Sequence, residues 1–346
     1  MIPFYRFYPD RLKANLDAYI RDYTVYYPCK VNSEGEVIDI VYAAGACFET
    51  DSVDMIARLV EKGIPAGRIL YNYLVRTDEN IADVVAFGVR DFAVDDATDV
   101  GRIVAVCPDA RFLIRVSISA LTPDIITDPT QDKWGADFDG VTRIADAVGA
   151  VGCDIIGYSF YYPKEFSTVE RISSAIETLL DRYGNDVVID VGGGISTDDA
   201  GRIADTFRGR CGGFIIEPGR HLVGDTFDCV CGIVDVKSRN GRRYVFLNVG
   251  IYSGFIDAVL KKHDFEIVLD GASNGECETV VVCGCTSDIS DTFGVYSLPR
   301  DLLVSGATAI IKNCGAYCLE MHTRFAGNRF EKKFISANLP GGNSDD

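Results

Sequence analysis

The chain has 346 residues, of which 47% are hydrophobic, and its formal net charge is −17. This length suffices for one large α/β domain and a smaller second one. The negative charge argues against nucleic acids and anionic membrane surfaces as partners. No apolar run is long enough to cross a bilayer, so we expect no membrane-spanning segment.

The 12 cysteines do not resemble a disulfide scaffold in a chain of this length. Residues 1–5 lack the basic and long apolar regions of a secretion signal, so we expect a cytoplasmic protein. Two cysteine pairs, Cys229/Cys231 and Cys283/Cys285, would each share one face of a strand. Because zinc-binding cysteines are usually separated by two to four residues, we expect no metal site.

The first part of the chain alternates strands, polar turns and amphipathic helices. Residues 4–8 predict a short strand, Asp10 is expected to cap a helix that ends near Asp22, and Asp51 to cap the helix over 52–62. Strands are predicted at 25–29, 46–48, 69–71, 91–94, 111–118, 154–160, 187–191 and 213–216. Helices between them are predicted at 52–62, 79–87, 97–106, 141–151, 167–183 and 197–207.

Eight strands that alternate with helices predict a (β/α)8 TIM-like barrel. The alternative is an open, doubly wound sheet. It is weakened because no G-x-G-x-x-G motif follows the first strand. The irregular stretch 119–138 is long for a connection, which favours a functional loop.

After about Val223 the helical periodicity largely disappears. We therefore expect a barrel domain over 5–222 and an all-β domain, a sandwich or barrel, over 223–339. Residues 1–4 can join the β-domain as an edge strand, and the tail 340–346 is expected to be disordered. The strands of the β-domain are predicted at 227–236, 243–249, 266–269, 278–282 and 302–304.

In a barrel of this kind the C-terminal ends of the strands build the active site. Lys30 ends the first strand, where burial readily lowers the pKa of a lysine, and a neutral amine can form a Schiff base with an aldehyde cofactor. The alternative is a lysine that extends from the strand end to the surface. Other polar or glycine residues collect at the same rim, namely Glu49, Arg115, Tyr161, Gly193, Gly194, Glu217, Gly219 and Arg220.

The glycine triplet 192–194 and the loop after the eighth strand favour an anion site. Glycines let backbone amides approach an anion closely, and barrels often bind phosphate with the loops after strands seven and eight. Arg220 could pair with a phosphate oxygen. Glu217 could accept a hydrogen bond from a protonated ring nitrogen, and its alternative role is a helix cap or a surface acid.

Four segments resemble the signatures of the pyridoxal-phosphate decarboxylases that act on ornithine, diaminopimelate and arginine. They are the lysine segment 27–32 with Gly45 downstream, the segment 190–195, the segment 217–220, and Gly-Ala-Tyr at 315–317. Their order and spacing agree from about Phe4 to Phe325. The resemblance implies an alanine-racemase-like barrel with a C-terminal β-domain.

The resemblance also implies roles for individual residues. Lys30 would hold pyridoxal 5'-phosphate as an internal aldimine, and Glu217 would keep the ring nitrogen protonated, so that the ring is an electron sink. Tyr161 would stack on the ring, and Glu49 and Arg115 would lie near the cofactor. The phosphate would be held by Gly193, Gly194, Gly219, Arg220 and Tyr317.

Members of this family are homodimers in which a loop of the partner's β-domain completes each site. That loop is 284–291 here, and it departs from the family pattern. Ser287 stands where the proton-donating cysteine is expected, and Cys285 replaces a proline, so either could be catalytic. Asp288 matches the acid that contacts the distal group of the substrate, which Tyr317 also contacts.

Other family positions differ as well. Lys164 stands in place of a phosphate-binding serine, and a further family acid has no clear match, with Asp257 and Asp264 as weak candidates. These changes indicate a pocket altered from plain ornithine or diaminopimelate chemistry.

The resulting prediction is α-decarboxylation of an amino acid, or of an amino-acid-bearing metabolite, with a cationic or large distal group. Such an enzyme would serve polyamine or specialised-metabolite synthesis. The alternatives are an amino-acid racemase, which needs two opposed bases, and a non-catalytic cofactor-binding homologue.

Overall fold

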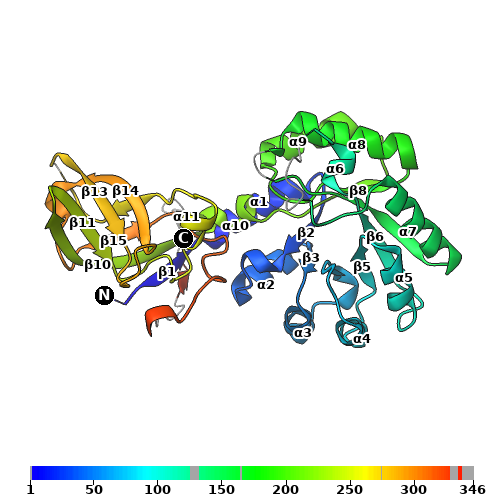
Figure 1. Cartoon of the computed structure of the whole chain (residues 1–346), viewed down its shortest axis with the longest axis horizontal. Coiled ribbons are helices and arrows are strands. Elements are labelled where there is room, and N and C mark those ends of the chain that lie inside the picture. The colour runs from blue at the N-terminus through cyan, green and yellow to red at the C-terminus, as the bar shows by residue number, and fades with distance from the viewer. Residues whose placement is uncertain (1, 125–131, 164–165, 274, 328–333, 337–346) are drawn as a thin grey trace, which may run out of the picture. The chain divides into compact units, whose positions relative to one another are not determined.

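The computed structural model describes residues 2–124, 132–163, 166–273, 275–327 and 334–336 (Figure 1). The chain forms two compact units. The barrel unit comprises Asn15–Lys30 and Ile38–His221, and the sheet unit comprises Met1–Ala14, Val31–Val37 and Leu222–Asp346. Lys164 and the tail 340–346, for which predictions were made above, lie outside the described residues.

The barrel unit contains eight parallel strands that close into a barrel in chain order. The ring closes where Thr24 and Val25 of the first strand pair with Ile215 and Ile216 of the last. The predicted (β/α)8 barrel is therefore confirmed, and the open sheet is excluded. The strands are β2 (Thr24–Pro28), β3 (Cys47–Thr50), β4 (Ile69–Tyr71), β5 (Asp91–Val94), β6 (Arg111–Arg115), β7 (Asp154–Ser159), β8 (Val188–Asp190) and β9 (Gly213–Ile216).

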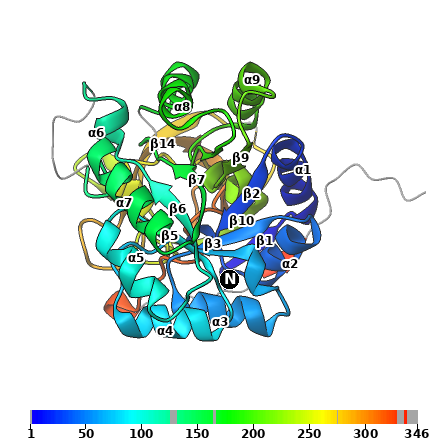
Figure 2. The same ribbon diagram turned by 90° about the vertical axis from the view of Figure 1, so that its right-hand side faces the viewer.

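Helices precede and connect these strands, and Figure 2 shows α3 to α5 and α7 to α9 placed around the ring. Side chains at the helix starts satisfy free N–H groups, as Ser52 does for Met55 at the start of α3. The helices are α1 (Pro9–Ile20), α2 (Gly35–Ala43), α3 (Val53–Glu61), α4 (Asp78–Ala86), α5 (Ala97–Val104), α6 (Ile118–Leu121), α7 (Phe138–Ala150), α8 (Val169–Tyr183), α9 (Thr197–Phe207) and α10 (Arg220–Val223).

The barrel is filled by side chains from strands on different sides of the ring. Tyr26, Leu70, Leu113 and Ile215 form a buried cluster, and partly buried side chains of neighbouring strands pack against it. Because β2, β4, β6 and β9 all contribute, the cluster lies among the strands rather than under one helix. The barrel is thus a packed core, and polar groups are left to the strand ends.

Predictions for residues 1–222 need correction at several points. Asp51 does not cap α3, because Ser52 takes that position, and Asp10 lies within the first turn of α1. The helix α2 was not predicted, since its β-branched run does not stand out from strand patterns. The strand predicted over 111–118 ends at Arg115, because Ser117 accepts the N–H of Ser119 and begins α6.

The sheet unit contains one eight-stranded mixed sheet. The strands are β1 (Phe4–Phe7), β10 (Phe227–Arg239), β11 (Arg242–Leu247), β12 (Ile267–Leu269), β13 (Cys277–Cys283), β14 (Thr292–Pro299), β15 (Thr308–Ile311) and β16 (Phe334–Ser336), and the short helix α11 spans Asp257–Leu260. Its longest strand is β10, which pairs with β1 and β15 through its first half and with β11 through its second half. A register shift between Ile233 and Asp235 interrupts the pairing with β11.

The strand expected at the N-terminus is present and pairs with β10, but it is not an edge strand, because β16 pairs with its other side. The strand predicted at 302–304 is wrong. Pro299 ends β14, and Arg300–Leu302 then form a 3-10 turn. The strands β14 and β15 and the helix α11 were not predicted.

Candidate active site

Lys30 lies in a 3-10 turn directly after β2. Its Nζ donates a hydrogen bond to Oε1 of Glu49 at 3.1 Å and lies 3.8 Å from Oδ2 of Asp51. The two strands are parallel neighbours, and Pro28 is paired with Glu49, so their ends bring the lysine and the acid together. Glu49 is fully buried, whereas 46% of the Lys30 side chain is exposed, so the amine lies between a buried acid and solvent.

The pKa of Lys30 is raised. Burial acts to lower the pKa of this amine, but the carboxylates of Glu49, Glu217 and Asp51 outweigh burial and hold it above its ordinary value. The lowered pKa expected from burial alone is therefore wrong for the free lysine, because the strand ends surround it with acids. The amine is a bound ammonium in this state.

A second pair of acids ends β8 and follows β9. Asp190 Oδ1 accepts the N–H of Gly192 at 2.9 Å, and Asn72 Nδ2 donates to Glu217 Oε1 at 3.3 Å. Burial raises the pKa of both carboxyls, and their mutual contact favours the proton on Glu217. Burial also raises the pKa of Glu49 to about 7, against the lowering effect of Lys30.

Two carboxylate oxygens of this cluster are left without a donor. Within the described residues, Oε2 of Glu49 and Oδ2 of Asp190 are buried and receive no hydrogen bond from an amide, hydroxyl or ammonium group, and Asp190 also contacts the carboxyl of Glu217. Buried polar atoms in proteins are nearly always satisfied. Unsatisfied acids at the end of a barrel are therefore candidates for contact with a bound molecule.

The turn after β8 forms a second candidate contact surface. Gly194 has a φ of +87°, and a Cβ placed on Gly193 would lie 2.6 Å from the carbonyl oxygen of Glu217, so side chains are excluded here. Ser167, in the loop before α8, has a buried hydroxyl with no partner among the described residues, and a Cβ on Gly194 would lie 3.8 Å from it. Sequence analysis missed Ser167 because it reads as the start of a helix.

The other candidates of the barrel unit occupy the same end of the strands. Arg115 is the last residue of β6, and its charge lowers the pKa of both Asp190 and Glu217. Tyr161 follows β7 and is 47% exposed. Gly219 immediately precedes Arg220, which begins α10.

The loop 284–291 of the sheet unit is held at its base by Asp291. This buried carboxylate accepts hydrogen bonds from the N–H of Ile251 at 2.8 Å and from the N–H and hydroxyl of Thr286 at 3.0 and 2.7 Å. Cys285 and Ser287 are exposed on this loop, and burial raises the pKa of the Cys285 thiol. Asp288 accepts the N–H of Ser290.

Tyr317, also in the sheet unit, has a left-handed backbone with a φ of +68°. Its N–H donates to the carbonyl of Val31, the residue after Lys30 in the chain, at 2.7 Å. Asn32 likewise donates to the carbonyl of Gly315 at 2.8 Å. A left-handed conformation is costly for a tyrosine, so these contacts fix a strained segment, and strain of this kind is common at functional sites.

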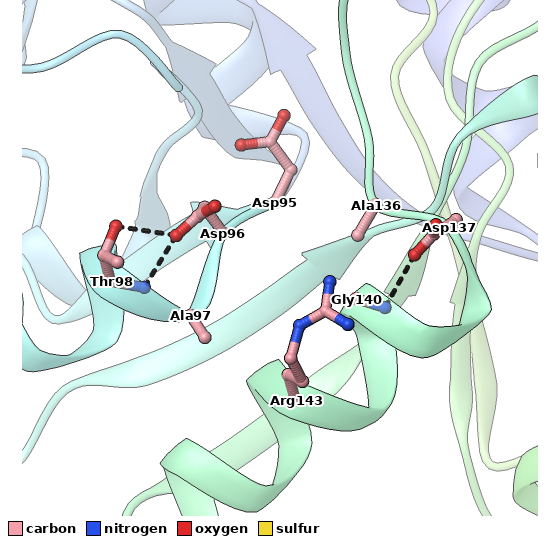
Figure 3. A pocket seen from close by; sticks show the side chains of 8 residues that line it. All are labelled: Asp95, Asp96, Ala97, Thr98, Ala136, Asp137, Gly140 and Arg143. Carbon is pink, nitrogen blue, oxygen red and sulfur yellow. Dashed lines mark hydrogen bonds between the residues drawn. The ribbon is translucent and has the colours of Figure 1, made fainter.

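A separate cavity of about 450 Å³ lies at the starts of α5 and α7 (Figure 3). Its lining includes none of the residues predicted for the active site. Asp96 accepts hydrogen bonds from Thr98, and Asp137 accepts the N–H of Gly140, so both acids serve as helix caps. The third acid of the lining, Asp95, accepts the N–H of Gly135, so all three acids already accept hydrogen bonds from the backbone.

Comparison with known proteins agrees with this geometry. The model of the pyridoxal-binding domain of pyridoxal-dependent decarboxylases matches residues 9–224. The chain belongs to this family. The resemblance that the four sequence segments indicated is therefore confirmed, as is pyridoxal phosphate as the cofactor.

Individual relatives are distant in sequence. Ornithine decarboxylase of Neurospora crassa is 22% identical over 276 residues, a match that covers 66% of this chain but only 55% of that protein. Lysine/ornithine decarboxylase of Selenomonas ruminantium is 21% identical, covering 91% of this chain and 84% of that one. The agmatine-bound arginine decarboxylase of Paramecium bursaria Chlorella virus has the same fold, with a TM-score of 0.86 at 20% identity over 97% of this chain and 96% of that one.

Proposed function

We propose that this decarboxylase removes the α-carboxyl group of an amino acid, or of an amino-acid-bearing metabolite, with a cationic or large distal group. The observation that carries the proposal is the contact of Lys30 with Glu49 beside the coupled acids Asp190 and Glu217. Lys30 would bond covalently to the aldehyde of the cofactor. The protonated cofactor ring, when bound, supplies the electron sink for the pair left by CO2.

The residues present fit the phosphate of this cofactor. The unpartnered hydroxyl of Ser167 next to Gly194 is a donor without an acceptor, and the glycine turn leaves room where a side chain would collide. Backbone amides in such turns bind anions. We therefore assign phosphate contacts to Gly193, Gly194 and Ser167, with Gly219 and Arg220 on the neighbouring loop.

The acids fit the ring of the cofactor. Glu217 would accept the N–H of the ring nitrogen and so keep that nitrogen protonated, with Asp190 as its buried neighbour. Arg115 moderates the charge of these acids, because it lowers the pKa of both. Tyr161, exposed after β7, is the proposed stacking side chain. Glu49 would accept a hydrogen bond from the Lys30 ammonium when this amine is free.

The proton that returns to the α-carbon would come from the loop 284–291. A thiol is a far stronger acid than a serine hydroxyl, so Cys285 is the better donor of the two candidates, and Ser287 is the alternative. Asp288 and Tyr317 are proposed to contact the distal part of the substrate. Substituting Cys285 and Ser287 separately by Ala would identify the donor, since only its loss should slow reprotonation.

We further propose a homodimer in which this loop completes the partner's site. The loop is fixed by Asp291, and its tip residue Ile289 is 93% exposed, as expected for a segment that contacts another chain. A mixture of Lys30→Ala and Cys285→Ala/Ser287→Ala chains would then regain about a quarter of the wild-type activity, because half of the dimers have one intact site. No recovery after exchange of subunits would contradict a shared site.

The test of the activity is CO2 release from the purified protein with pyridoxal phosphate, across basic amino acids and α-carboxylated conjugates. We expect release with at least one member and none from Lys30→Ala. Loss of the α-proton with the carboxyl group retained would instead indicate a racemase. Equal turnover of free ornithine, lysine and diaminopimelate would argue against a large distal group.

The cytoplasm is the proposed location. All 12 cysteines are unpaired, which fits a reducing compartment. Within the part of the chain that the structure describes, no helix is long and apolar enough to span a membrane.

A further inference from the structure

Lys30 is in contact with a second acid that belongs to none of the signature segments. Asp51 Oδ2 lies 3.8 Å from Nζ, and 40% of the Asp51 side chain is exposed, whereas Glu49 is fully buried. The two carboxylates therefore flank the amine in different surroundings, one in the protein interior and one facing solvent.

The position of Asp51 is fixed by its neighbours in the chain. The N–H of Ser52 donates to the Thr50 hydroxyl at 3.1 Å, and the Ser52 hydroxyl caps α3. Because Ser52 performs the capping, the Asp51 carboxylate is not needed for the helix. It is left at the rim of the barrel, beside the exposed part of Lys30.

The charged groups around Lys30 indicate different roles for Glu49 and Asp51. Glu49, Asp51 and Glu217 face the amine, and Asp190 and Arg115 act on it through Glu217. Glu49 has a pKa of about 7, so it is partly protonated near neutrality and is then a weak partner for an ammonium. Asp51 contacts the same amine from the solvent side of the site.

We propose that Asp51 is a positioning residue that holds the Lys30 ammonium at the solvent side of the site whenever this amine is not bonded to the cofactor. The role in the reaction rests on the proposed function. A substrate ammonium must give up one proton before its amine can replace Lys30, and the released lysine amine takes up one proton in turn and becomes an ammonium, so the exchange is balanced. Asp51 pairs with this ammonium and keeps it away from the reacting carbon.

The direct test measures the reactivity of Lys30 in the full-length protein freed of cofactor. Acetic anhydride, a neutral reagent, acetylates only neutral amines, and peptide mass spectrometry follows the rate at Lys30 relative to the exposed Lys13. At pH 8 to 9 we expect Asp51→Asn to accelerate acetylation of Lys30 by roughly 3- to 10-fold, as loss of a carboxylate at this distance implies. Asp51→Glu should restore slow acetylation.

The matched control is Asp54→Asn, which removes an exposed acid three residues further on, in the first turn of α3. It should leave the rate at Lys30 unchanged. An unchanged rate in Asp51→Asn, or an equal acceleration in both variants, would overturn the proposal.

A second readout uses the protein with its cofactor. The visible absorbance of the bond between Lys30 and pyridoxal phosphate should form at a pH lower by roughly half to one unit in Asp51→Asn. A failure of wild-type protein to form this absorbance would contradict the proposed function, whereas the acetylation rates would still decide the role of Asp51.

Discussion

The C-terminal strand ends of the barrel and the sheet unit both bury carboxylates, but the hydrogen bonds that these acids accept differ. In the sheet unit, Asp228 accepts hydrogen bonds from Tyr8, Lys312 and the N–H of Asn313. Asp291 accepts three more, one from Ile251 and two from Thr286. In the barrel unit, Glu49 and Asp190 each keep one buried oxygen without a donor among the described residues.

This difference separates acids that stabilise the fold from acids that can still accept a hydrogen bond from a ligand. An unmade hydrogen bond to a buried polar group costs about 1–3 kcal/mol, so a protein retains it only where something else uses the group. The saturated acids fix the loop 284–291 and the strand ends of the sheet. Of the unsaturated acids, Glu49 contacts Lys30, and Asp190 neighbours Glu217, the acid proposed to accept the ring N–H of the cofactor.

The largest effect is expected from Lys30→Ala. The variant should lose the visible absorbance of the bound cofactor, and kcat should fall by at least ~1,000-fold, because Lys30 is the amine proposed to bond to the cofactor. Absorbance and CO2 release measure the two losses. The variant should still fold, because Glu49 without its lysine partner would be protonated, and a neutral carboxyl group can remain buried. An active Lys30→Ala protein would refute the assignment of the site.

Asp291→Asn should be the most destabilising of the acid substitutions. The amide puts an N–H group where Ile251 or Thr286 already donates, so we expect a loss of about 2–4 kcal/mol in the free energy of unfolding. Urea denaturation measures it. If this variant were as stable as the wild type, a full set of hydrogen bonds to a buried acid would not indicate a structural role in this protein.

The barrel could be predicted from sequence because its strands are nearly continuous apolar runs bounded by polar turns. The strand β14 could not, since most of its residues are only partly buried and its hydrophobic pattern is weak. The predicted residues at strand ends, such as Lys30, Glu49 and Glu217, follow from topology, because parallel strands of a barrel end on one rim.

Asp51 and Ser167 show where sequence reasoning fails. Each stands just before a helix, and the sequence pattern predicted Asp51 as a helix cap and Ser167 as the first residue of a helix. Their contacts come from other segments of the chain: Lys30 for Asp51, and the turn at Gly194 for Ser167. The closed barrel sets the distances between loops, and the local sequence pattern does not reveal these distances.

Glu49→Gln tests the comparison through the pH dependence of the free energy of unfolding. Burial raises the pKa of Glu49 to about 7, so the folded protein binds this proton more tightly than the unfolded chain does. Wild-type stability therefore falls as pH rises from the ordinary glutamate pKa to about 7. Relative to wild type, cofactor-free Glu49→Gln should be equally stable near pH 4 and more stable by about 1–3 kcal/mol above pH 7.

Urea denaturation across this pH range, with the exposed Glu61→Gln as control, measures the difference. A gain that did not change with pH would contradict the raised pKa of Glu49. A loss of stability at pH 8 would mean that this acid is structural, like Asp291, and the contrast between the two units would fail.

The smallest effect is expected from Ser167→Ala. Removing an unpartnered buried hydroxyl should leave the stability of the free protein unchanged or raise it slightly, while the cofactor loses one donor to its phosphate. We expect the Kd for pyridoxal phosphate to rise by about 5- to 10-fold, the equivalent of one hydrogen bond, with kcat at saturating cofactor nearly unchanged. Ser174→Ala, at an exposed position of α8, is the matched control and should change neither quantity. The opposite result, a destabilised free protein with unchanged affinity, would show that the hydroxyl serves the fold and that the glycine turn binds the phosphate without it.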